Sequence, residues 1–367
     1  MSYDLNGIKI DSFGNMKNKG NRVKNTKALI LVYMKRSILS LLYLIQGMRK
    51  AGINVDQKLE RIGLNEKALD PSSIIHPSLE QSVLAALGEG IAPEQGLIIG
   101  QQYSLAGHGP LLMLLVASDN IEKVLEKGVE YSRLTHLNGH LDVQYFENKI
   151  ALRLKPLNLD TQLGCFLAHC EVSGTYRFIL DLFNIMDVEL PSIQVSLPFR
   201  FPENSELKQM YIDVFGDEIA FNSEQAMFYF DREILHKKIM SADPISFKTY
   251  EKKCENELMR LREVDNNPSL IQRVKDYLEL QQGTIPSMAE TSKALKIPER
   301  TLRHQLCQMQ TSYKQIREDV IKQKALKLIE YQEYSIETIA HLLGYSEPAA
   351  FNHAFKRWFG YSPRQYK

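Results

Sequence analysis

The sequence predicts an α/β domain followed by an all-α domain that contains the same two-helix unit twice. Helical and strand periods alternate up to about residue 262, whereas the apolar patterns after residue 269 are helical. The 367 residues are 44% hydrophobic and 24% charged, as in a folded chain of roughly two domains. We therefore predict a basic extension, an α/β domain, a linker and an all-α domain, at residues 1–36, 37–262, 263–269 and 270–367.

The N-terminal extension is basic, with eight Lys/Arg against two Asp/Glu in residues 1–36. We expect disorder there, because the first 27 residues are rich in Asn, Lys and Gly. Lys35 and Arg36 interrupt the apolar run well short of the about 20 residues that span a membrane, and no small-residue cleavage site follows. Neither a membrane span nor a targeting signal is predicted, and Met34 is an alternative start to Met1.

The α/β domain is predicted from its alternating patterns. Leu41, Leu44, Ile45 and Met48 recur at helical spacing before Gly52, which is typical of a helix end. Two alternating apolar runs flank the pair Glu147-Asn148 and predict a hairpin. The predicted strands are 141–146, 149–154, 193–199 and 227–230, and helices are predicted at 121–137 and 165–182.

The all-α domain follows a polar stretch that contains the helix-breaking Pro268. Helices are predicted from spacing at 271–280, 287–295, 299–309, 313–331, 336–343 and 349–359. This part is also basic, since residues 268–367 hold 15 Lys/Arg against 10 Asp/Glu, while residues 37–267 hold 22 against 32. Such asymmetry favours a polyanionic partner for the C-terminal part, although solvated faces also carry such charge.

The doubled unit is a helix-turn-helix. In the second copy an apolar stripe ends at Gly344, Ser346 is placed to cap the next helix, and small Ala340 allows two helices to cross closely. In the first copy Leu302 and Leu306 mark the buried face of the second helix. The helix at 313–331, about 28 Å long, joins the copies. Recognition helices held this way suit successive major-groove segments, roughly 34 Å apart.

Residues 336–366 read IETIAHLLGYSEPAAFNHAFKRWFGYSPRQY and resemble the C-terminal signature of the arabinose-operon-regulator (AraC/XylS) family nearly throughout. Residues 297–306 and 311–314 resemble the first helix-turn-helix of that family more loosely. Gln310 stands where many members have glycine, and Pro298 where many have a capping serine. The resemblance implies a bacterial transcription regulator that binds promoter DNA.

Residues 50–262 also resemble, more diffusely, the N-terminal domain of the subgroup called the arabinose-binding type, whose members answer to varied small molecules. The pieces that carry this resemblance are 51–53, 107–118, 215–221 and 227–231. It implies an α/β sensor domain that binds an effector and forms a homodimer. RNA polymerase is a further expected partner of such a regulator.

In the first unit, Arg300, Arg303 and His304 lie opposite Leu302 and Leu306 and match the family's base-contacting positions. The arginine fork fits O6 and N7 of guanine in the major groove. In isolation, such arginines would be interpreted as a solvated helix face. Two matched helix-turn-helix units favour the DNA-binding interpretation.

In the second unit the corresponding positions are Ala349, Ala350, Asn352, His353, Lys356 and Arg357. Alanine suits contact with a thymine methyl group and Asn352 suits adenine, whereas Lys356 and Arg357 are expected at phosphates. Lys314, Lys322 and Lys324 are further candidates for phosphate contact or for a solvated helix face. Trp358 and Phe355 are expected in the core.

Effector-binding candidates are polar or aromatic residues beside apolar helices: Tyr103, His108, His136, His140, His169, Tyr176 and Arg177. Each is also compatible with a purely structural role. An amphipathic or anionic effector is expected, because apolar residues 111–117 follow His108 and Arg177 offers a cation.

The sequence predicts neither a metal nor a cofactor. Cys165, His169 and Cys170 are close in sequence but lack a second ligand pair at zinc spacing, and four cysteines are too few for a disulfide scaffold. Reduced cysteines fit a cytoplasmic protein.

No catalytic motif is present, so we expect no enzyme. The alternatives are a constitutive DNA binder whose N-terminal domain only dimerises or meets another protein, and a DNA-repair alkyl acceptor. The latter needs a nucleophilic cysteine in a Pro-Cys-His-Arg type motif, which is absent.

Overall fold

The computed structural model describes residues 36–66, 69–137, 140–155, 159–262, 269–281, 284–330 and 334–366. The predicted extension, except Arg36, and residues 263–268 of the predicted linker lie outside this range. Within it, no helix is both long enough and apolar enough to cross a membrane. The chain divides into two compact units.

Unit 1 comprises residues 39–54 and 88–262. Its helices are α2 (Leu39–Lys50), α5 (Gln95–Gly100), α6 (Pro110–Val116), α7 (Ile121–Glu130), α8 (Gln162–Ile185), α9 (Ser205–Phe215) and α10 (Pro244–Arg262). Its strands are β3 (His140–Tyr145), β4 (Lys149–Lys155), β5 (Gln194–Ser196), β6 (Ile219–Ala220) and β7 (Ala226–Asp231). The strands form one sheet in the order β3-β4-β7-β5-β6, antiparallel except for β5 with β6.

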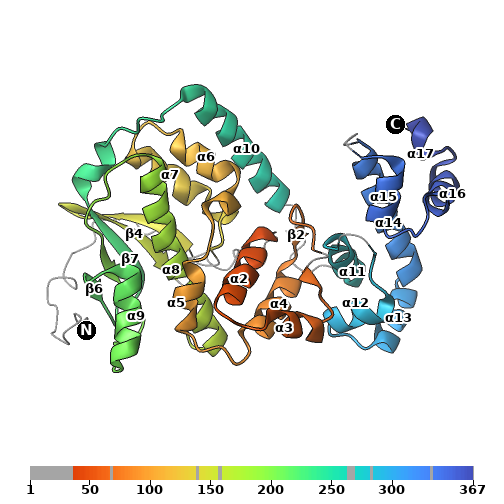
Figure 1. The fold of residues 1–367 in the computed structure, drawn as a ribbon, viewed down its shortest axis with the longest axis horizontal. Coiled ribbons are helices and arrows are strands. Elements are labelled where there is room, and N and C mark those ends of the chain that lie inside the picture. The colour runs from red at the N-terminus through yellow and green to blue at the C-terminus, as the bar shows by residue number, and fades with distance from the viewer. Residues whose placement is uncertain are drawn as a thin grey trace. The chain divides into compact units, whose positions relative to one another are not determined.

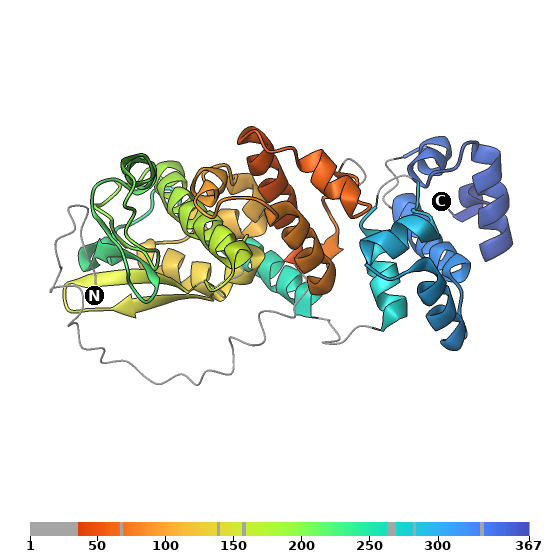
Figure 2. The same ribbon diagram turned by 90° about the horizontal axis from the view of Figure 1, so that it is seen from below.

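The predicted hairpin is confirmed. Leu141 pairs with Leu154 and Tyr145 with Ile150, and the Phe146 N–H donates to the Lys149 carbonyl at 2.8 Å across the turn. Figure 2 shows β3 and β4 as the yellow arrows at the edge of the sheet. The long α8 runs beside β4 and β7 in Figure 1, and its apolar side chains share one core with those of the sheet.

The helix predicted at 121–137 is shorter than expected. The Asn120 side chain caps α7 by accepting from the Lys123 N–H at 2.9 Å, but the helix ends at Glu130 and a 3₁₀ helix covers Ser132–Leu134. The Thr135 hydroxyl donates to the Ser132 carbonyl, and such a local bond competes with helix continuation. The structure also adds α9 and α10, which the spacing analysis did not predict.

Unit 2 comprises residues 36–38 and 55–87 together with the described residues from 269 onward. Residues 55–87 are thus grouped with the C-terminal helices, although the sequence analysis places them in the α/β domain. The elements are β1 (Arg36–Ser37), α3 (Val55–Arg61), β2 (Ile74–Ile75), α4 (Pro77–Gly88), α11 (Leu270–Glu279), α12 (Met288–Ala294), α13 (Glu299–Gln308), α14 (Tyr313–Glu330), α15 (Ile336–Leu342), α16 (Pro348–Phe359) and α17 (Pro363–Tyr366).

Polar contacts join residues 55–87 to α11 and α12 within unit 2. The Tyr277 hydroxyl donates to the Gly63 carbonyl at 2.9 Å, and the Lys293 ammonium donates to the Glu60 carbonyl at the same distance. The Asp70 N–H donates to the Leu280 carbonyl at 2.8 Å. The first helix-turn-helix therefore packs against a segment that lies about 200 residues earlier in the sequence.

The six helices predicted in the C-terminal part are all present, within two residues at either end. Ala340 of α15 is fully buried and belongs to the same apolar cluster as Phe351 and Phe355 of α16. Ser346 does not cap α16: Glu347 occupies the N-cap position without a side-chain bond, and Pro348 opens the helix with a fixed φ and no N–H to satisfy. Figure 1 shows α14 between the two helix-turn-helix units.

Candidate nucleic-acid interface and effector site

The second helix of the first unit, α13, separates an apolar face from a basic one. Leu302 and Leu306 are buried, whereas Arg300, Arg303 and His304 are exposed. Buried leucines four residues apart fix the rotation of the helix, so the other three side chains share its solvent face. The arrangement is the one that major-groove reading by a recognition helix requires.

Arg303 is the best-positioned base-reading candidate on α13. Its side chain is 72% exposed, and its guanidinium forms an ion pair with Glu299 at 2.9 Å, one turn earlier. A surface pair of this kind stabilises little, so the guanidinium can exchange the carboxylate for a base edge at small cost. No described contact anchors Arg300 or His304 in the same way, and both remain on the exposed face.

The two departures from the family pattern have visible consequences in the first unit. Gln310 adopts φ +56°, the left-handed conformation that favours glycine. Pro298 occupies the N-cap position of α13 and makes no side-chain cap there. The helix nevertheless runs from Glu299 to Gln308, so neither substitution displaces the exposed basic face.

The second helix of the second unit, α16, exposes small side chains in its first turn and basic ones in its last turn. Phe351 and Phe355 are buried, while Ala349, Ala350, His353 and Lys356 are exposed and Asn352 is half-buried. The two alanines leave room for close approach of another surface, and Asn352 is the amide available there for hydrogen bonding.

Arg357 is held by a residue that the sequence analysis missed. Glu318 on α14 accepts from the Arg357 guanidinium at 3.0 Å and from Nε1 of Trp358. Trp358 is therefore not a fully buried core residue as predicted: it is half-buried, and its indole N–H needs this polar partner. Lys322 lies over the same indole ring, 6.0 Å from its centroid.

Of the lysines considered for phosphate contact, Lys314 is exposed but Lys324 turns inward. The Lys324 ammonium donates to the Gln281 carbonyl within unit 2. Burial lowers its pKa to about 8, partly offset by the carboxylates of Asp70 and Glu279. Lys324 thus has a structural partner within unit 2, unlike exposed Lys314.

Three of the effector candidates come together in unit 1. The rings of Tyr103 and His136 stack with centroids 4.5 Å apart, and His108 meets His136 edge-on at 5.7 Å. Gly174 on α8 makes room for this stack, because a Cβ there would lie 2.5 Å from the Tyr103 ring. His108 and His136 also line a cavity, which Tyr103 does not reach.

The other effector candidates lie elsewhere. Tyr176 is a core residue whose hydroxyl donates to the Phe215 carbonyl at 3.3 Å, and Arg177 forms a surface ion pair with Asp181 at 2.8 Å. His169 is buried and stacks on Phe199. His140 opens β3, and its side chain lies outside the described part of the structure.

Cys165 and His169 make local hydrogen bonds. The Cys165 thiol donates to the Leu159 carbonyl, and the His169 ring bonds the Cys165 carbonyl at 2.7 Å and the Tyr211 hydroxyl at 2.8 Å. Over the described residues, no group of three or more His, Cys, Asp and Glu side chains is arranged to hold a metal ion.

A chain that combines two exposed recognition-type helices on a shared helical scaffold with an α/β unit has the make-up of a DNA-binding transcription regulator. Residues 291–367 match the family model of a helix-turn-helix domain, and residues 52–239 match that of the arabinose-binding domain of AraC transcription regulators. The latter match spans half of the chain, and the protein belongs to the AraC family.

Curated relatives are transcriptional regulators and not enzymes. The chain is 26% identical to the HTH-type transcriptional regulator VqsM of Pseudomonas aeruginosa, over 77% of this chain and 86% of that one. It is 27% identical to the ornithine utilization regulator of the same species, over 79% and 82%. The crystal structure of the P. aeruginosa regulator CdpR aligns with 89% of this chain and 97% of its own at 21% identity, with a TM-score of 0.45.

Proposed function

We propose that this regulator binds promoter DNA through the exposed faces of α13 and α16, and that a small molecule held in unit 1 controls that binding. The observation that carries the DNA-binding part is the separation on α13 between buried Leu302 and Leu306 and exposed Arg300, Arg303 and His304. The effector part is supported by the cavity beside His108 and His136 and by the match to the arabinose-binding domain.

The two recognition helices divide the work by chemistry. Arg300 and Arg303 can read guanine edges, because guanidinium groups donate two parallel hydrogen bonds to O6 and N7. Ala349, Ala350 and Asn352 offer apolar and amide contacts, while Lys356 offers charge to a phosphate. Arg357, whose guanidinium pairs with Glu318 but is 69% exposed, offers a second positive charge to a phosphate.

A homodimer acting in the cytoplasm, in contact with RNA polymerase, remains a prediction from the family resemblance.

The experiment is footprinting of the full chain on the DNA upstream of its own gene, with and without a small-molecule extract of the producing cells. The variant carrying both Arg300→Ala and Arg303→Ala should lose the footprint. Its matched control is Lys50→Ala, which removes an exposed cation from α2 of unit 1. A footprint that survives in the double variant contradicts the assignment of α13. A wild-type footprint that no extract alters favours a constitutive DNA binder.

A further inference from the structure

The cavity in unit 1 is built by helices α6, α7 and α8 against the sheet. Its volume is about 80 Å³, several times the roughly 10–15 Å³ that one water molecule needs. Leu111, Val124, Ile179 and Phe230 represent its walls, one from each of these elements. The cavity is partly open to solvent, so an apolar molecule longer than this space can enter it and extend outward.

None of the described residues that line the cavity is charged. An anionic group placed there would lose its hydration without gaining a counter-ion, which is strongly unfavourable. Arg177, the cation that motivated an anionic effector, lies outside the lining and is paired with Asp181. The surroundings therefore favour an uncharged occupant.

The polar groups of the lining are histidines and threonines. Burial lowers the pKa of His108 to about 4, although hydrogen bonds to the carbonyls of Leu105 and Ser104 act in the opposite direction. His108 is therefore neutral near pH 7. Its Nδ1 donates to the Leu105 carbonyl at 3.2 Å, so Nε2 is the hydrogen-bond acceptor of the neutral ring. The Thr175 hydroxyl, by contrast, donates to the Glu171 carbonyl at 2.7 Å.

Gly128 supplies an independent observation. It lies inside α7 and lines the cavity, and a Cβ built on it would meet no atom within 4 Å. Gly100 and Gly174 differ, because a Cβ on either would lie within 2.5 Å of a neighbour and their packing excludes a side chain. A helix-interior glycine is unfavourable relative to alanine, and nothing in the described packing requires one at 128. The space beside Gly128 is left open by the chain itself.

We propose that this cavity binds an uncharged, mainly apolar small molecule with one hydrogen-bond donor, its apolar body lying beside Gly128 and its donor on Nε2 of His108. The inference rests on the proposed effector control and names the chemical class of the effector. The sequence predicted an amphipathic or anionic effector. The lining of the cavity favours an amphipathic effector that carries no charge.

The first test is displacement of the neutral fluorescent probe N-phenyl-1-naphthylamine from the full chain at neutral pH. The competitors are 1-octanol, 2-octanone and octanoate, which share a chain length and differ in the polar group. We expect 1-octanol to displace the probe at concentrations at least about tenfold below octanoate, and severalfold below 2-octanone, which has no donor. Displacement by octanoate at equal or lower concentration would overturn the proposal.

The second test places the site. Gly128→Leu should weaken displacement by 1-octanol at least about tenfold, because the side chain fills the open space, whereas the control Gly128→Ala should stay within about twofold. If Gly128→Leu does not fold, His108→Phe is the deciding variant. It removes Nε2, the proposed acceptor, so 1-octanol should displace the probe no better than 2-octanone. Unchanged displacement in folded Gly128→Leu, or a retained alcohol preference in His108→Phe, would overturn the assignment.

Promoter footprinting separates this inference from the proposed function. A footprint on promoter DNA without specific displacement of the probe overturns the cavity proposal alone. Specific displacement that obeys the variant pattern, on a chain that leaves no footprint, supports the ligand class and contradicts the DNA-binding assignment.

Discussion

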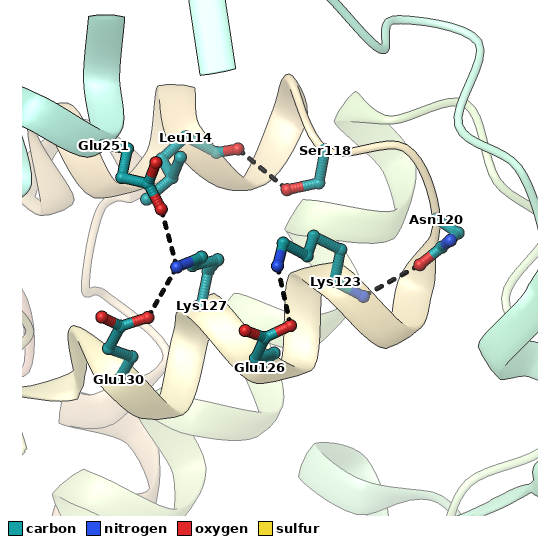
Figure 3. Close-up of polar contacts among 8 residues, drawn as sticks. All are labelled: Leu114, Ser118, Asn120, Lys123, Glu126, Lys127, Glu130 and Glu251. Atoms are coloured by element: carbon teal, nitrogen blue, oxygen red, sulfur yellow. Dashed lines mark hydrogen bonds and ion pairs between the residues drawn. The ribbon is translucent and has the colours of Figure 1, made fainter. Parts of the chain in front are cut away.

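The ammonium group of Lys127 on α7 lies 2.7 Å from a carboxylate oxygen of Glu251 on α10, as Figure 3 shows. A second carboxylate, that of Glu130, lies at the same distance, and the Lys127 side chain is only 9% exposed. Burial opposes the charge, but the hydrogen bonds to both carboxylates outweigh it and raise the pKa of Lys127 above its usual range. The pair thus joins a cavity-lining helix to α10, the last helix before residues 263–268.

Lys127→Met should loosen α10, because it leaves two carboxylates without their shared cation. We expect a loss of about 1 to 3 kcal/mol, given that Glu130 and Glu251 keep partial access to water. The matched control is Lys123→Met on the same helix, whose pair with Glu126 is exposed and should be worth less than about 1 kcal/mol. The measurement is the rate at which Cys254, fully buried on α10, reacts with a thiol reagent. Equal rates in the two variants would show that the buried pair does not hold α10.

Arg303→Ala should change the preference for DNA sequence, whereas Lys356→Ala should change only the affinity for DNA. Loss of Arg303 should cost about 1 to 3 kcal/mol at a cognate site and relax preference at one base position. Loss of Lys356 should weaken binding to cognate and random DNA alike, because a phosphate contact carries no sequence information. Competition binding against single-base variants of the footprinted site measures both. An unchanged preference profile for Arg303→Ala would remove that residue from base reading.

Gln310→Gly should stabilise unit 2. The left-handed backbone at φ +56° is strained for glutamine and natural for glycine, so we expect a gain of about 0.5 to 1 kcal/mol after the extra entropy of the unfolded glycine is subtracted. Gln308→Gly, in the last turn of α13, should instead cost a similar amount. Urea unfolding followed by the fluorescence of Trp358, the single tryptophan, reports both. A destabilised Gln310→Gly would show that the glutamine side chain compensates the strain.

Unit 1 should lose stability in mild acid. Burial lowers the pKa of His108 and of His169 to about 4, while the unfolded chain binds protons below about pH 6.5. The stabilisation is complete above pH 6.5 and is lost as the pH falls toward 4, by about 2 kcal/mol for each histidine near pH 5. Hydrogen exchange of α8 against pH measures the change. His169→Gln should flatten the profile, whereas substitution of exposed His236 should not.

The sequence predicted what depends on neighbouring residues. The hairpin around Glu147-Asn148, the helices of the C-terminal part and the exposed face of α13 follow from local spacing, and all are confirmed in the fold. Contacts between distant segments were not predicted, because the hydrophobic periodicity of a segment does not indicate which other segment it packs against. Glu318 orients Arg357 across 39 positions, and the cavity gathers residues from several elements. The local signals for the cavity were His108 and His136, polar residues beside apolar helices, whereas Gly128 was not singled out from the sequence.

The isolated fragment 264–367 should retain DNA binding, because both helix-turn-helix units and their joining helix lie within it. Its affinity should fall steeply with salt, since each phosphate neutralised by Lys or Arg releases counter-ions. The fragment lacks residues 55–87, however, and with them the Gly63 carbonyl that accepts from Tyr277. A fragment that folds and shows no salt-dependent binding to promoter DNA would contradict the prediction.

Tyr277→Phe then tests whether residues 55–87 stabilise the first helix-turn-helix. In the full chain the substitution removes the 2.9 Å hydrogen bond to Gly63 and leaves a partly buried carbonyl without this donor, which should cost about 1 kcal/mol. In the fragment that bond is already absent, so the same substitution should cost close to nothing. The four proteins are the full chain and the fragment, each with and without Tyr277→Phe. Hydrogen exchange of their α11 amides gives the cost of the substitution in each, and the difference between the two costs is the coupling to residues 55–87. Equal costs in the full chain and the fragment would show that residues 55–87 contribute nothing through Tyr277, and would leave the Asp70 and Glu60 contacts as the links between that segment and the C-terminal helices.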